Sequence, residues 1–467
     1  MQVAYIELGI NKGDVIGVAH VSSCLLVANY LALFGLGAHL LPLPDEGEKS
    51  DYLKVFEEVI PKYIIYSSNA GIIYEEKQKI HFLCDDVADN YVVEGKEVLQ
   101  KLECINGNKD LGFKSIPVII GKASEELYDL EEGKQYLNIT SGSTGKIKIA
   151  NVSTYKIILN AIASNNSFPL KYNDNYCCMF STGMHPHELF AKPLIAGSGN
   201  VLLRLSSIIR FDKYVYEKNI TQIVAVPAIY KILLEIGLNK HNWSNVKYIL
   251  SGGEITNYFV RKEFFAATEK KIIPVWGSTE TTGLVFYVPE ELLLTEDNYI
   301  GVPLPEYSVK VEDETNRLMI KGAACFEGYC NVDNNKYFSK DGYYITDDIV
   351  KKDERGVYQY CGRINEIVKI NGKKVNLSLL KQALLKEEEV ADVEIICNEV
   401  DNDKLLGVFC VLKRGKKLNY DSVSRLLSVK AKYHIFILDT FPLLPSKKID
   451  YVKLKSMVQE SKEHGKI

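Results

Sequence analysis

The 467-residue sequence lacks the features of several specialised classes of protein. Its 56 basic and 60 acidic residues give a net charge of −4, so it has no basic excess of the kind that binds nucleic acid. It contains no internal repeat and no low-complexity segment. Its 46% hydrophobic and 25% charged residues are typical of a soluble globular protein, and the length predicts two or three domains.

The ten cysteines form no Cys-x-x-Cys pair. Cys177 and Cys178 are adjacent, which suits neither a metal site nor an ordinary disulfide. We therefore expect reduced cysteines in a cytoplasmic protein.

One uncharged run, residues 21–43, is long enough to span a bilayer. It contains polar residues such as Asn29 and His39, and no basic segment precedes it. We predict instead a buried helix over about 22–34, a break at glycine, and a buried strand over 38–43, without membrane insertion.

A strand-like run from Tyr136 leads into a loop of small residues, TSGSTGKIK, which extends from Thr140 to Lys148. Glycines let backbone N–H groups turn toward one point, hydroxyls add donors and lysine adds positive charge, all of which suit a polyphosphate. The loop is not a Walker A motif, because Gly142 and Gly145 are too close together. Taken alone, it is either a phosphate site or a solvated turn.

Further strands are predicted to end in polar loops. The runs 246–250 and 271–275 lead into SGGE (251–254) and WGSTE (276–280). Strands that alternate with helices predict a mostly parallel sheet, and ligands bind beyond the carboxyl ends of such strands. These loops could line one crevice with the phosphate-like loop, although each alone could simply turn the chain.

The segment 183–188, GMHPHE, brings two histidines and a carboxylate together around a proline. Zinc ligation is one reading, but no third strong ligand follows at a recognisable spacing. We favour a loop near the substrate, with His185 or His187 as a pocket residue and Glu188 as the nearby acid.

The last third of the sequence changes character. A hairpin is predicted over 309–320, and the strand beginning at Tyr343 is predicted to end in Asp347 and Asp348. A second hairpin turns at Asn371-Gly372. Residues from about 364 onward are predicted to form a small, separate α+β domain.

Five segments resemble motifs of the adenylate-forming superfamily, which includes acyl- and aryl-CoA ligases, firefly luciferase and the adenylation domains of nonribosomal peptide synthetases. They are TSGSTGKIK (140–148), WGSTE (276–280), TDD (346–348), the stretch 362–372 and PSKKID (445–450). They follow the family's order over nearly the whole chain. The resemblance implies an α/β fold with a large N-terminal domain of mixed, mostly parallel sheets (1–363) and a small mobile α+β C-terminal domain (364–467).

The sequence also departs from the family's pattern. Asp347 replaces a glycine in the segment expected to hold the ribose, and Asn365 stands at the hinge. Residues 1–14 already resemble a Gly-x-x-x-Gly-Asp segment, so we expect the family's leading region to be missing. A degenerate nucleotide-binding relative without ligase activity is therefore an alternative.

The resemblance implies ATP- and Mg²⁺-dependent activation of a small carboxylic acid as an acyl-adenylate, with release of pyrophosphate. Lys448, Thr144 and Glu280 would be catalytic, with Glu280 holding Mg²⁺ and the hinge at Asn365. The implied nucleotide contacts are Thr140, Ser141, Gly142, Ser143, Gly145, Lys148, Gly252, Gly253, Glu254, Trp276, Gly277, Ser278, Thr279, Asp348 and Arg363.

The acyl group would then pass to a thiol of CoA or of a carrier-protein phosphopantetheine, so a carrier protein is a candidate partner. Amino-acid-activating relatives usually carry an Asp near the position of His185, and none stands there. That absence favours an acyl or aryl acid. Amino-acid adenylation and a P-loop-like ATPase are the alternatives.

Overall fold

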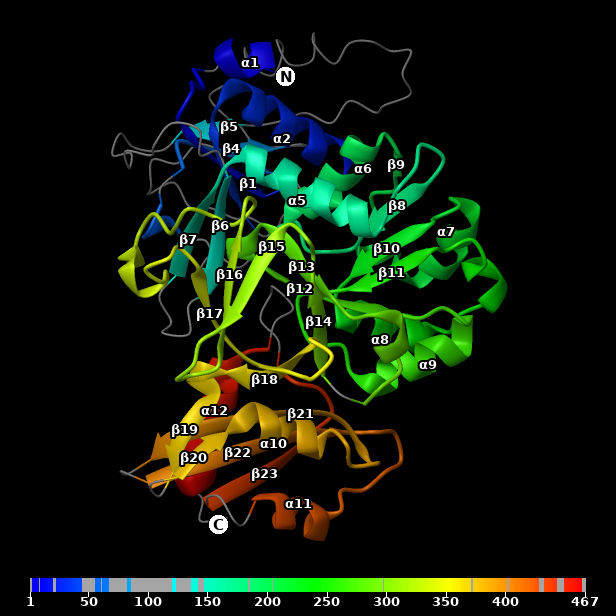
Figure 1. Ribbon diagram of the computed structural model, residues 1–467, viewed down its shortest axis with the longest axis vertical. Coiled ribbons are helices and arrows are strands. Elements are labelled where there is room, and N and C mark those ends of the chain that lie inside the picture. Colours follow the sequence, from blue (N-terminus) through cyan, green and yellow to red (C-terminus); the bar gives the residue numbers. More distant parts are fainter. Residues whose placement is uncertain are drawn as a thin grey trace, which may run out of the picture. The chain divides into compact units, whose positions relative to one another are not determined.

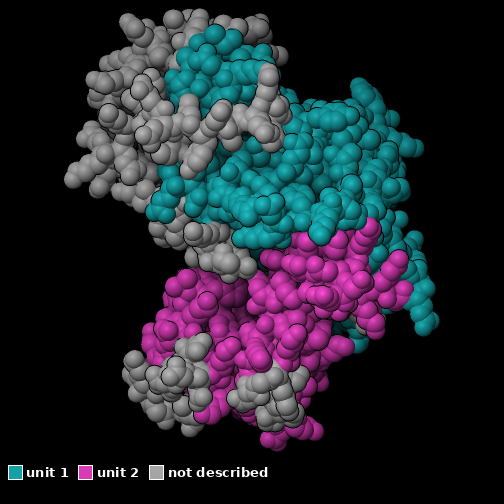
Figure 2. Space-filling view, turned by 60° about the vertical axis from the view of Figure 1, so that its left-hand side comes forward, with its two compact units in different colours: residues 1–309, 320–344, 354–358 teal, residues 310–319, 345–353, 359–467 magenta. Residues whose placement is uncertain are grey.

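The computed structural model describes residues 2–7, 9–19, 22–43, 55–59, 61–66, 82–84, 120–122, 136–141, 147–183, 185–203, 205–296, 298–370, 373–400, 403–427, 432–442 and 449–463. The chain divides into two compact units, coloured separately in Figure 2. The first comprises Met1–Val309, Ile320–Tyr344 and Glu354–Tyr358, and the second comprises Lys310–Met319, Ile345–Asp353 and Gln359–Ile467. The predicted mixed α/β fold, with large N-terminal sheets and a small C-terminal domain, is confirmed. The exact boundary at residue 363 and the hinge stay predictions.

The first sheet of unit 1 has seven strands within the described residues, in the order β4-β5-β3-β1-β2-β6-β7 (Figure 1). Its strands are β1 Val15–Ala19, β2 His39–Pro42, β3 Tyr63–Tyr66, β4 Phe82–Cys84, β5 Ile120–Lys122, β6 Tyr136–Ser141 and β7 Ile147–Val152. The central strands β1, β2 and β3 are parallel, whereas β6 and β7 form an antiparallel hairpin. This hairpin carries the phosphate-like loop at its tip.

The uncharged run near the N-terminus folds as predicted into a helix, a glycine break and a strand. Helix α2 spans Cys24–Leu36, and the Ser23 side chain caps its first turn by accepting a hydrogen bond from the Leu26 amide. Gly37 ends the helix with φ of 73°, a conformation that favours glycine, and β2 follows with every residue buried. No helix in the described part of the chain is long and apolar enough to cross a membrane.

The second sheet has eleven strands within the described residues, seven of which lie wholly in unit 1. These seven are β8 Asn175–Cys178, β9 Gly199–Asn200, β10 Gln222–Ala225, β11 Tyr248–Ser251, β12 Ile273–Ser278, β13 Gly283–Tyr287 and β14 Tyr299–Pro303, and antiparallel pairing begins at β12–β13. Strands β8, β10, β11 and β12 run parallel, so their carboxyl ends meet at one edge of the sheet. This is the edge at which the predicted polar loops lie.

Helices complete unit 1. Besides α2, those in the described residues are α1 Gln2–Glu7, α5 Thr154–Ser167, α6 Ala191–Ala196, α7 Phe211–Glu217, α8 Pro227–Ile236 and α9 Tyr258–Thr268. Short 3₁₀ turns are η2 Pro186–Leu189, η3 Leu205–Arg210, η4 Lys240–Trp243, η5 Thr279–Thr281, η6 Glu290–Leu292 and η7 Asn334–Lys336.

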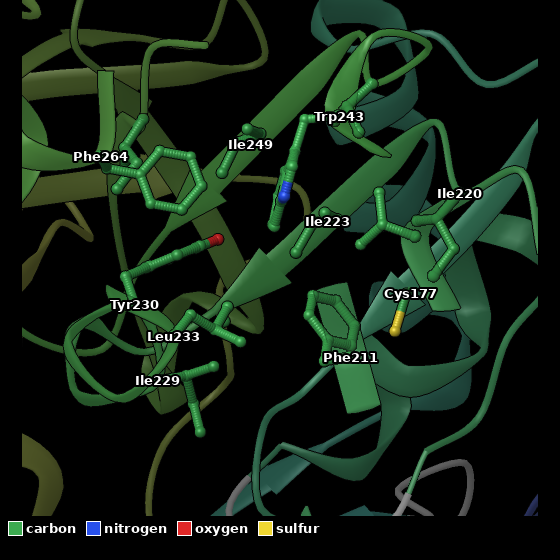
Figure 3. Close-up of a cluster of buried hydrophobic side chains, with 14 of the residues drawn as sticks. Cys177, Phe211, Ile220, Ile223, Ile229, Tyr230, Leu233, Trp243, Ile249 and Phe264 are labelled. Atoms are coloured by element: carbon green, nitrogen blue, oxygen red, sulfur yellow. The ribbon is translucent and has the colours of Figure 1, made fainter. Parts of the chain in front are cut away.

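A cluster of aromatic and aliphatic side chains packs α7, α8 and α9 against the parallel strands (Figure 3). Trp243 and Phe264 pack edge to face with ring centroids 5.1 Å apart, and both are fully buried. Each buried side chain of this size stabilises the fold by roughly 1.5–3 kcal/mol, so the cluster is a rigid support for the strand ends. Cys177 lies in it, and burial raises the pKa of its thiol to about 12, which keeps it protonated. The eight cysteines whose side chains the structure describes are free.

The remaining strands include β15 Tyr307–Val311, β16 Arg317–Gly322, β17 Tyr344–Lys352 and β18 Tyr358–Arg363. The first two form the predicted hairpin, whose turn closes with a 2.9 Å bond from the Glu312 amide to the Arg317 carbonyl. One detail of the prediction is wrong. Asp347 and Asp348 do not end their strand, because β17 continues through Lys352 with Ile349 and Val350 buried.

The C-terminal part of unit 2 is an α+β fold, as predicted. It contains η8 Ile364–Glu366, β19 Ile367–Ile370, β20 Lys373–Asn376, α10 Leu377–Leu384, β21 Val390–Val400, β22 Asp403–Leu412, α11 Tyr420–Leu427, β23 Lys432–Leu438 and α12 Tyr451–Glu463. Strands β19 and β20 form the predicted hairpin with Ile370 opposite Lys373, and its turn residues Asn371 and Gly372 lie outside the described residues. Asn376 caps α10 by accepting from the Leu379 amide at 3.1 Å.

Candidate active site

One face of the β6–β7 hairpin presents a row of polar groups. Directly opposed residues share a face of a sheet, and the opposed pairs are Tyr136 with Val152, Asn138 with Ala150, and Thr140 with Lys148. The alternate face packs into the core through the apolar side chains of Leu137, Ile139, Ile147 and Ile149. The strand alternation therefore fixes which residues point toward the candidate site.

The tip of this loop is not described. Gly142, Ser143, Thr144 and Gly145 lie outside the described residues, as does the side chain of Ser141. Their predicted phosphate contacts stay predictions.

Lys148, Tyr329 and Glu280 form a chain of hydrogen bonds. Lys148 Nζ donates to the Tyr329 hydroxyl at 3.1 Å, and this hydroxyl donates to Glu280 Oε1 at 2.6 Å. The ammonium also lies 4.5 Å from the ring centroid of Tyr329 and 4.7 Å from that of Tyr337. Burial, with the negative charge of Glu280, raises the pKa of Tyr329, so the phenol stays protonated as the donor. A cation and a carboxylate are thus held on either side of one hydroxyl.

The Glu280 loop is fixed by its own backbone. The Thr281 hydroxyl accepts from the Ser278 amide at 2.9 Å and donates to the Gly283 carbonyl at 2.9 Å. Thr282 adopts φ of 61°, which is unusual for a β-branched residue. A Cβ at Gly277 would collide with the Gly283 carbonyl, so the tight fold of this loop requires glycine there.

The Glu280 side chain is suited to act as a magnesium ligand. Its carboxylate is a hard oxygen donor with only 7% of the residue exposed. Mg²⁺ is usually held by one or two carboxylates together with substrate phosphates and water. A site of that kind does not need several protein ligands. Within the described residues, no group of three or more His, Cys, Asp or Glu residues is placed to hold a metal.

His187 is buried between the two sheets of unit 1. Its Nε2 lies 3.0 Å from the Thr282 carbonyl and its Nδ1 lies 3.2 Å from the Tyr136 hydroxyl. Because a carbonyl can only accept, Nε2 carries the proton and Nδ1 accepts from Tyr136. Burial lowers the pKa of His187 to about 4, so the ring is neutral at physiological pH. His187 therefore ties β6 to the residue that follows the Glu280 turn.

His185 lies nearer the open edge. It is partly exposed, and its Nδ1 is 3.4 Å from Asn138 Nδ2 of β6. Its ring centroid is 6.5 Å from that of Phe180, on the same loop. Of the two predicted pocket histidines, His185 is the one with accessible surface.

The predicted adenine segments meet at this edge. A Cβ placed on Gly252 would lie 3.0 Å from Val275 and 3.7 Å from Phe180, so the loops after β8 and β11 lie beside strand β12. Trp276 packs edge to face on Phe286 with centroids 5.7 Å apart. Gly253 has φ of 88°, and Glu254 beside it is exposed.

Unit 2 carries the predicted ribose pair. Arg363 Nε donates to Asp348 Oδ1 at 2.8 Å; the Asp348 side chain is 6% exposed and that of Arg363 is 52% exposed. The negative charge of Asp348 raises the pKa of Arg363. The Thr346 hydroxyl accepts from the Asp348 amide at 3.1 Å and so fixes the strand around the carboxylate. Asp347 is partly exposed.

Of the two other residues predicted to act in the second unit, the structure describes Asn365 but not Lys448. Asn365 lies in η8, between β18 and β19, where the Arg363 amide and the Ser378 hydroxyl both donate to Glu366. Lys448 lies in the segment 443–448, outside the described residues, so its role stays a prediction.

Motif reading missed three side chains of this region. Tyr329 and Tyr337 contact Lys148 although more than 180 residues separate Tyr329 from it along the chain. Asn138 belongs to the strand before the loop and not to the loop itself. The sequence contains a signal for Asn138, because it is a polar residue in a strand-like apolar run. It contains none for the tyrosines, which only the fold brings close to Lys148.

The family comparison agrees with this geometry. Residues 4–330 match the family described as AMP-binding enzyme. The chain belongs to this family. It is an adenylate-forming enzyme whose relatives include a CoA ligase and peptide synthetases.

Individual relatives are distant. The chain is 22% identical to 4-hydroxybutyrate–CoA ligase 1 of Metallosphaera sedula, over 98% of this chain and 83% of that protein. It is 25% identical to gramicidin S synthase 2 of Brevibacillus brevis, over 68% of this chain but only 8% of that protein. Among solved structures, o-succinylbenzoate CoA synthetase from Bacillus subtilis, in complex with ATP and magnesium, matches with a TM-score of 0.74 at 18% identity. That match covers 98% of this chain and 92% of that one.

Proposed function

We propose that this enzyme uses ATP and Mg²⁺ to activate an acyl or aryl acid that has no α-amine, and then passes the acyl group to a phosphopantetheine thiol. The observation that carries the proposal is the Lys148–Tyr329–Glu280 chain at the base of the phosphate-like loop. Lys148 provides a cation for phosphate oxygens, and Glu280 provides a buried carboxylate for a metal.

Negative charge on the phosphates is the main electrostatic demand of the first step. Lys148 faces the end of β6, where the loop begins, and its ammonium is held by two tyrosine rings. Glu280 would hold Mg²⁺, which supplies positive charge beside the phosphate oxygens. The solved relative with ATP and magnesium supports this choice of ligands.

The ribose would bind at Asp348, whose carboxylate accepts from hydroxyls, with Arg363 beside it. The C-terminal lysine, Lys448, would contact the acid carboxylate and the α-phosphate. Movement of the second unit about Asn365 would remove Lys448 after the first step and admit the thiol.

The sequence around His185 has no Asp to hold an ammonium, which supports an acid without an α-amine. Glu188 is the acid next to the histidine loop, and a Cβ at Gly283 would collide with its carboxylate. Burial raises the pKa of Glu188 to about 7, and the neighbouring Lys192 ammonium opposes that shift. Glu188 thus contacts Gly283 of β13 and is opposed by Lys192, so this carboxylate already has a cationic neighbour in the protein.

A pyrophosphate-exchange screen tests this function. Purified enzyme with ATP, Mg²⁺ and labelled pyrophosphate is offered fatty, aryl and α-amino acids one at a time. We expect exchange with an acyl or aryl acid, and formation of AMP, not ADP, when CoA or a phosphopantetheinylated carrier protein is added. Exchange that requires an α-amino acid would overturn the proposed substrate class, and ATP binding without exchange for any acid would indicate a degenerate relative.

A further inference from the structure

The polar face of β6 contains hydrogen-bonding capacity that the protein itself does not use. Asn138 is 2% exposed, and no described residue partners its Oδ1. The hydroxyls of Thr140 and Thr182 are likewise buried, with no partner among the described residues. A buried polar group left unpaired costs about 1–3 kcal/mol, so an apolar residue would stabilise the strand better at position 138.

An unpaired oxygen does not by itself make a site. Asn151 also has a buried Oδ1 that no described residue partners, but it lies opposite Leu137 on the core face of the same hairpin. Asn138 lies on the other face, where its Nδ2 is 3.4 Å from Nδ1 of His185. The loop that carries His185 also carries Thr182, three positions earlier. Asn138 therefore faces the candidate acid pocket and Asn151 does not.

The position of Asn138 along β6 matters. It stands two residues before Thr140, which places it about 7 Å deeper in the sheet than the beginning of the phosphate-like loop. Its opposed residue on β7 is Ala150, a small side chain. The ring of Phe180 is near both His185 and Gly252. Contacts therefore connect Asn138, through His185 and Phe180, to the loop after β11, and the acyl part of an acid would bind along these residues.

Asn138 lies beside the imidazole of His185, and Thr182 on the loop of His185 adds a buried hydroxyl that no described residue partners. His187 is a neutral ring fixed on both sides. The nearest acid in sequence, Glu188, is opposed by Lys192. A neutral hydrogen-bonding group on the substrate matches this set, and a hydroxyl suits it well because it both donates and accepts.

We infer that Asn138, supported by Thr182, binds a hydroxyl group on the acyl part of the substrate, so that the enzyme selects a hydroxylated acid over its alkyl or methyl isostere. This inference rests on the proposed acid activation. It makes Asn138 a specificity residue, and it predicts discrimination between acids that differ in a single group.

Matched acid pairs test the inference in the wild-type enzyme. The pairs are 4-hydroxybutyrate with pentanoate, 3-hydroxybutyrate with 3-methylbutyrate, and 4-hydroxybenzoate with 4-methylbenzoate. A site built to bind a hydroxyl rejects the analogue without it strongly, and we expect kcat/KM for exchange to favour one hydroxy acid by about 100-fold or more. Equal rates within every pair would overturn the inference and leave acid activation standing, whereas no exchange with any acid would overturn acid activation itself.

A pair of variants locates the effect. Asn138→Leu, which is nearly isosteric, is expected to reduce the preference of the best pair to below about 10-fold, mainly through a higher KM for the hydroxy acid, while exchange with its alkyl isostere is kept or improved. Asn151→Leu makes the same change on the opposite face and should leave the preference as in the wild type. The inference fails if Asn138→Leu keeps the wild-type preference, or if Asn151→Leu loses it equally.

Discussion

The two units hold their charged groups in different ways. In unit 1, Glu280 and Lys148 are joined through the Tyr329 hydroxyl, and the Glu280 turn is fixed by Thr281 and by the αL residue Thr282. In unit 2, the Asp348 carboxylate is buried, but the side chain of its partner Arg363 is 52% exposed.

This difference indicates a division of labour. Groups that are fixed by buried hydrogen bonds are organised before substrate arrives, which is how charge stabilisation in a transition state is achieved at low cost. A half-exposed arginine can exchange water for a ligand. We therefore expect unit 1 to provide a fixed site for phosphate and metal, and unit 2 to provide groups that engage in particular steps.

The largest expected effect tests the contribution of unit 2. Lys448→Ala should reduce acid-dependent exchange by at least about 1000-fold, because no other cation is expected to bridge the carboxylate and the α-phosphate. ATP affinity, measured by titration calorimetry, should stay within about threefold. Lys447→Ala provides a matched control in the same segment and should keep near-normal exchange. Normal exchange in Lys448→Ala would remove this residue from the mechanism.

The next effect tests the fixed site of unit 1. Glu280→Gln keeps the shape of the side chain and removes its charge, so exchange should fall about 100-fold and the Mg²⁺ concentration needed for half-maximal rate should rise. The magnesium titration separates a metal ligand from a residue that only stabilises the loop. Glu290→Gln, on the exposed η6, is the control and should leave the titration unchanged. An unaltered Mg²⁺ dependence in Glu280→Gln would argue against a metal role.

A smaller effect is expected at the ribose pair. Asp348→Asn removes the charge that holds Arg363 and should raise the KM for ATP about 10-fold, with little change in the KM for the acid. The neighbouring substitution Asp347→Asn should change neither value by more than about twofold. A change in the KM for the acid without a change in the KM for ATP would contradict the assignment of Asp348 to the ribose.

The smallest effect concerns the pH dependence of unit 1. Burial lowers the pKa of His187 from 6.5 to about 4, so below pH 6.5 the unfolded chain binds a proton that the folded chain does not. Between pH 6.5 and 4 this penalises folding, by about 2 kcal/mol at pH 5. Glu188 acts in the opposite direction, because its raised pKa favours folding as pH falls through the same range.

Comparison of the wild type with His187→Gln isolates the histidine. Urea unfolding at pH 7 and pH 5 should show a stability loss in the wild type that is larger than in the variant by about 2 kcal/mol. The same loss in both proteins would mean that His187 is not held in its neutral form.

Much of unit 1 could be predicted from local patterns. The break at Gly37 and the strand Tyr63–Tyr66 follow from glycine conformation and from a short β-rich run. The parallel strands β11 and β12 were identified because each apolar run stops at a polar, glycine-bearing segment. The end predicted for β12 at residue 275 was too early, because the strand continues through Trp276 to Ser278 and pairs with β13. The assignment of the five motifs did not come from such patterns and required the family resemblance.

What could not be predicted depends on contacts between distant segments. Tyr329 has no motif of its own, and its place between Lys148 and Glu280 follows from the packing of β7 beside residues 325–331. His187 and His185 are equivalent in sequence, yet one is fixed between two sheets and the other is partly exposed. The strand through Asp348 was predicted too short because two adjacent acids favour a solvent-exposed position. In the structure, Arg363 pairs with the buried Asp348 carboxylate, and the Thr346 hydroxyl accepts a hydrogen bond from the Asp348 amide.

Acid-dependent exchange of labelled pyrophosphate into ATP tests the central claim most directly. With Mg²⁺ and an acyl or aryl acid, the wild-type enzyme is expected to exchange, Glu280→Gln to exchange about 100-fold more slowly, and Lys448→Ala not to exchange measurably. ATP hydrolysis to ADP without any acid-dependent exchange would contradict acid activation by this site.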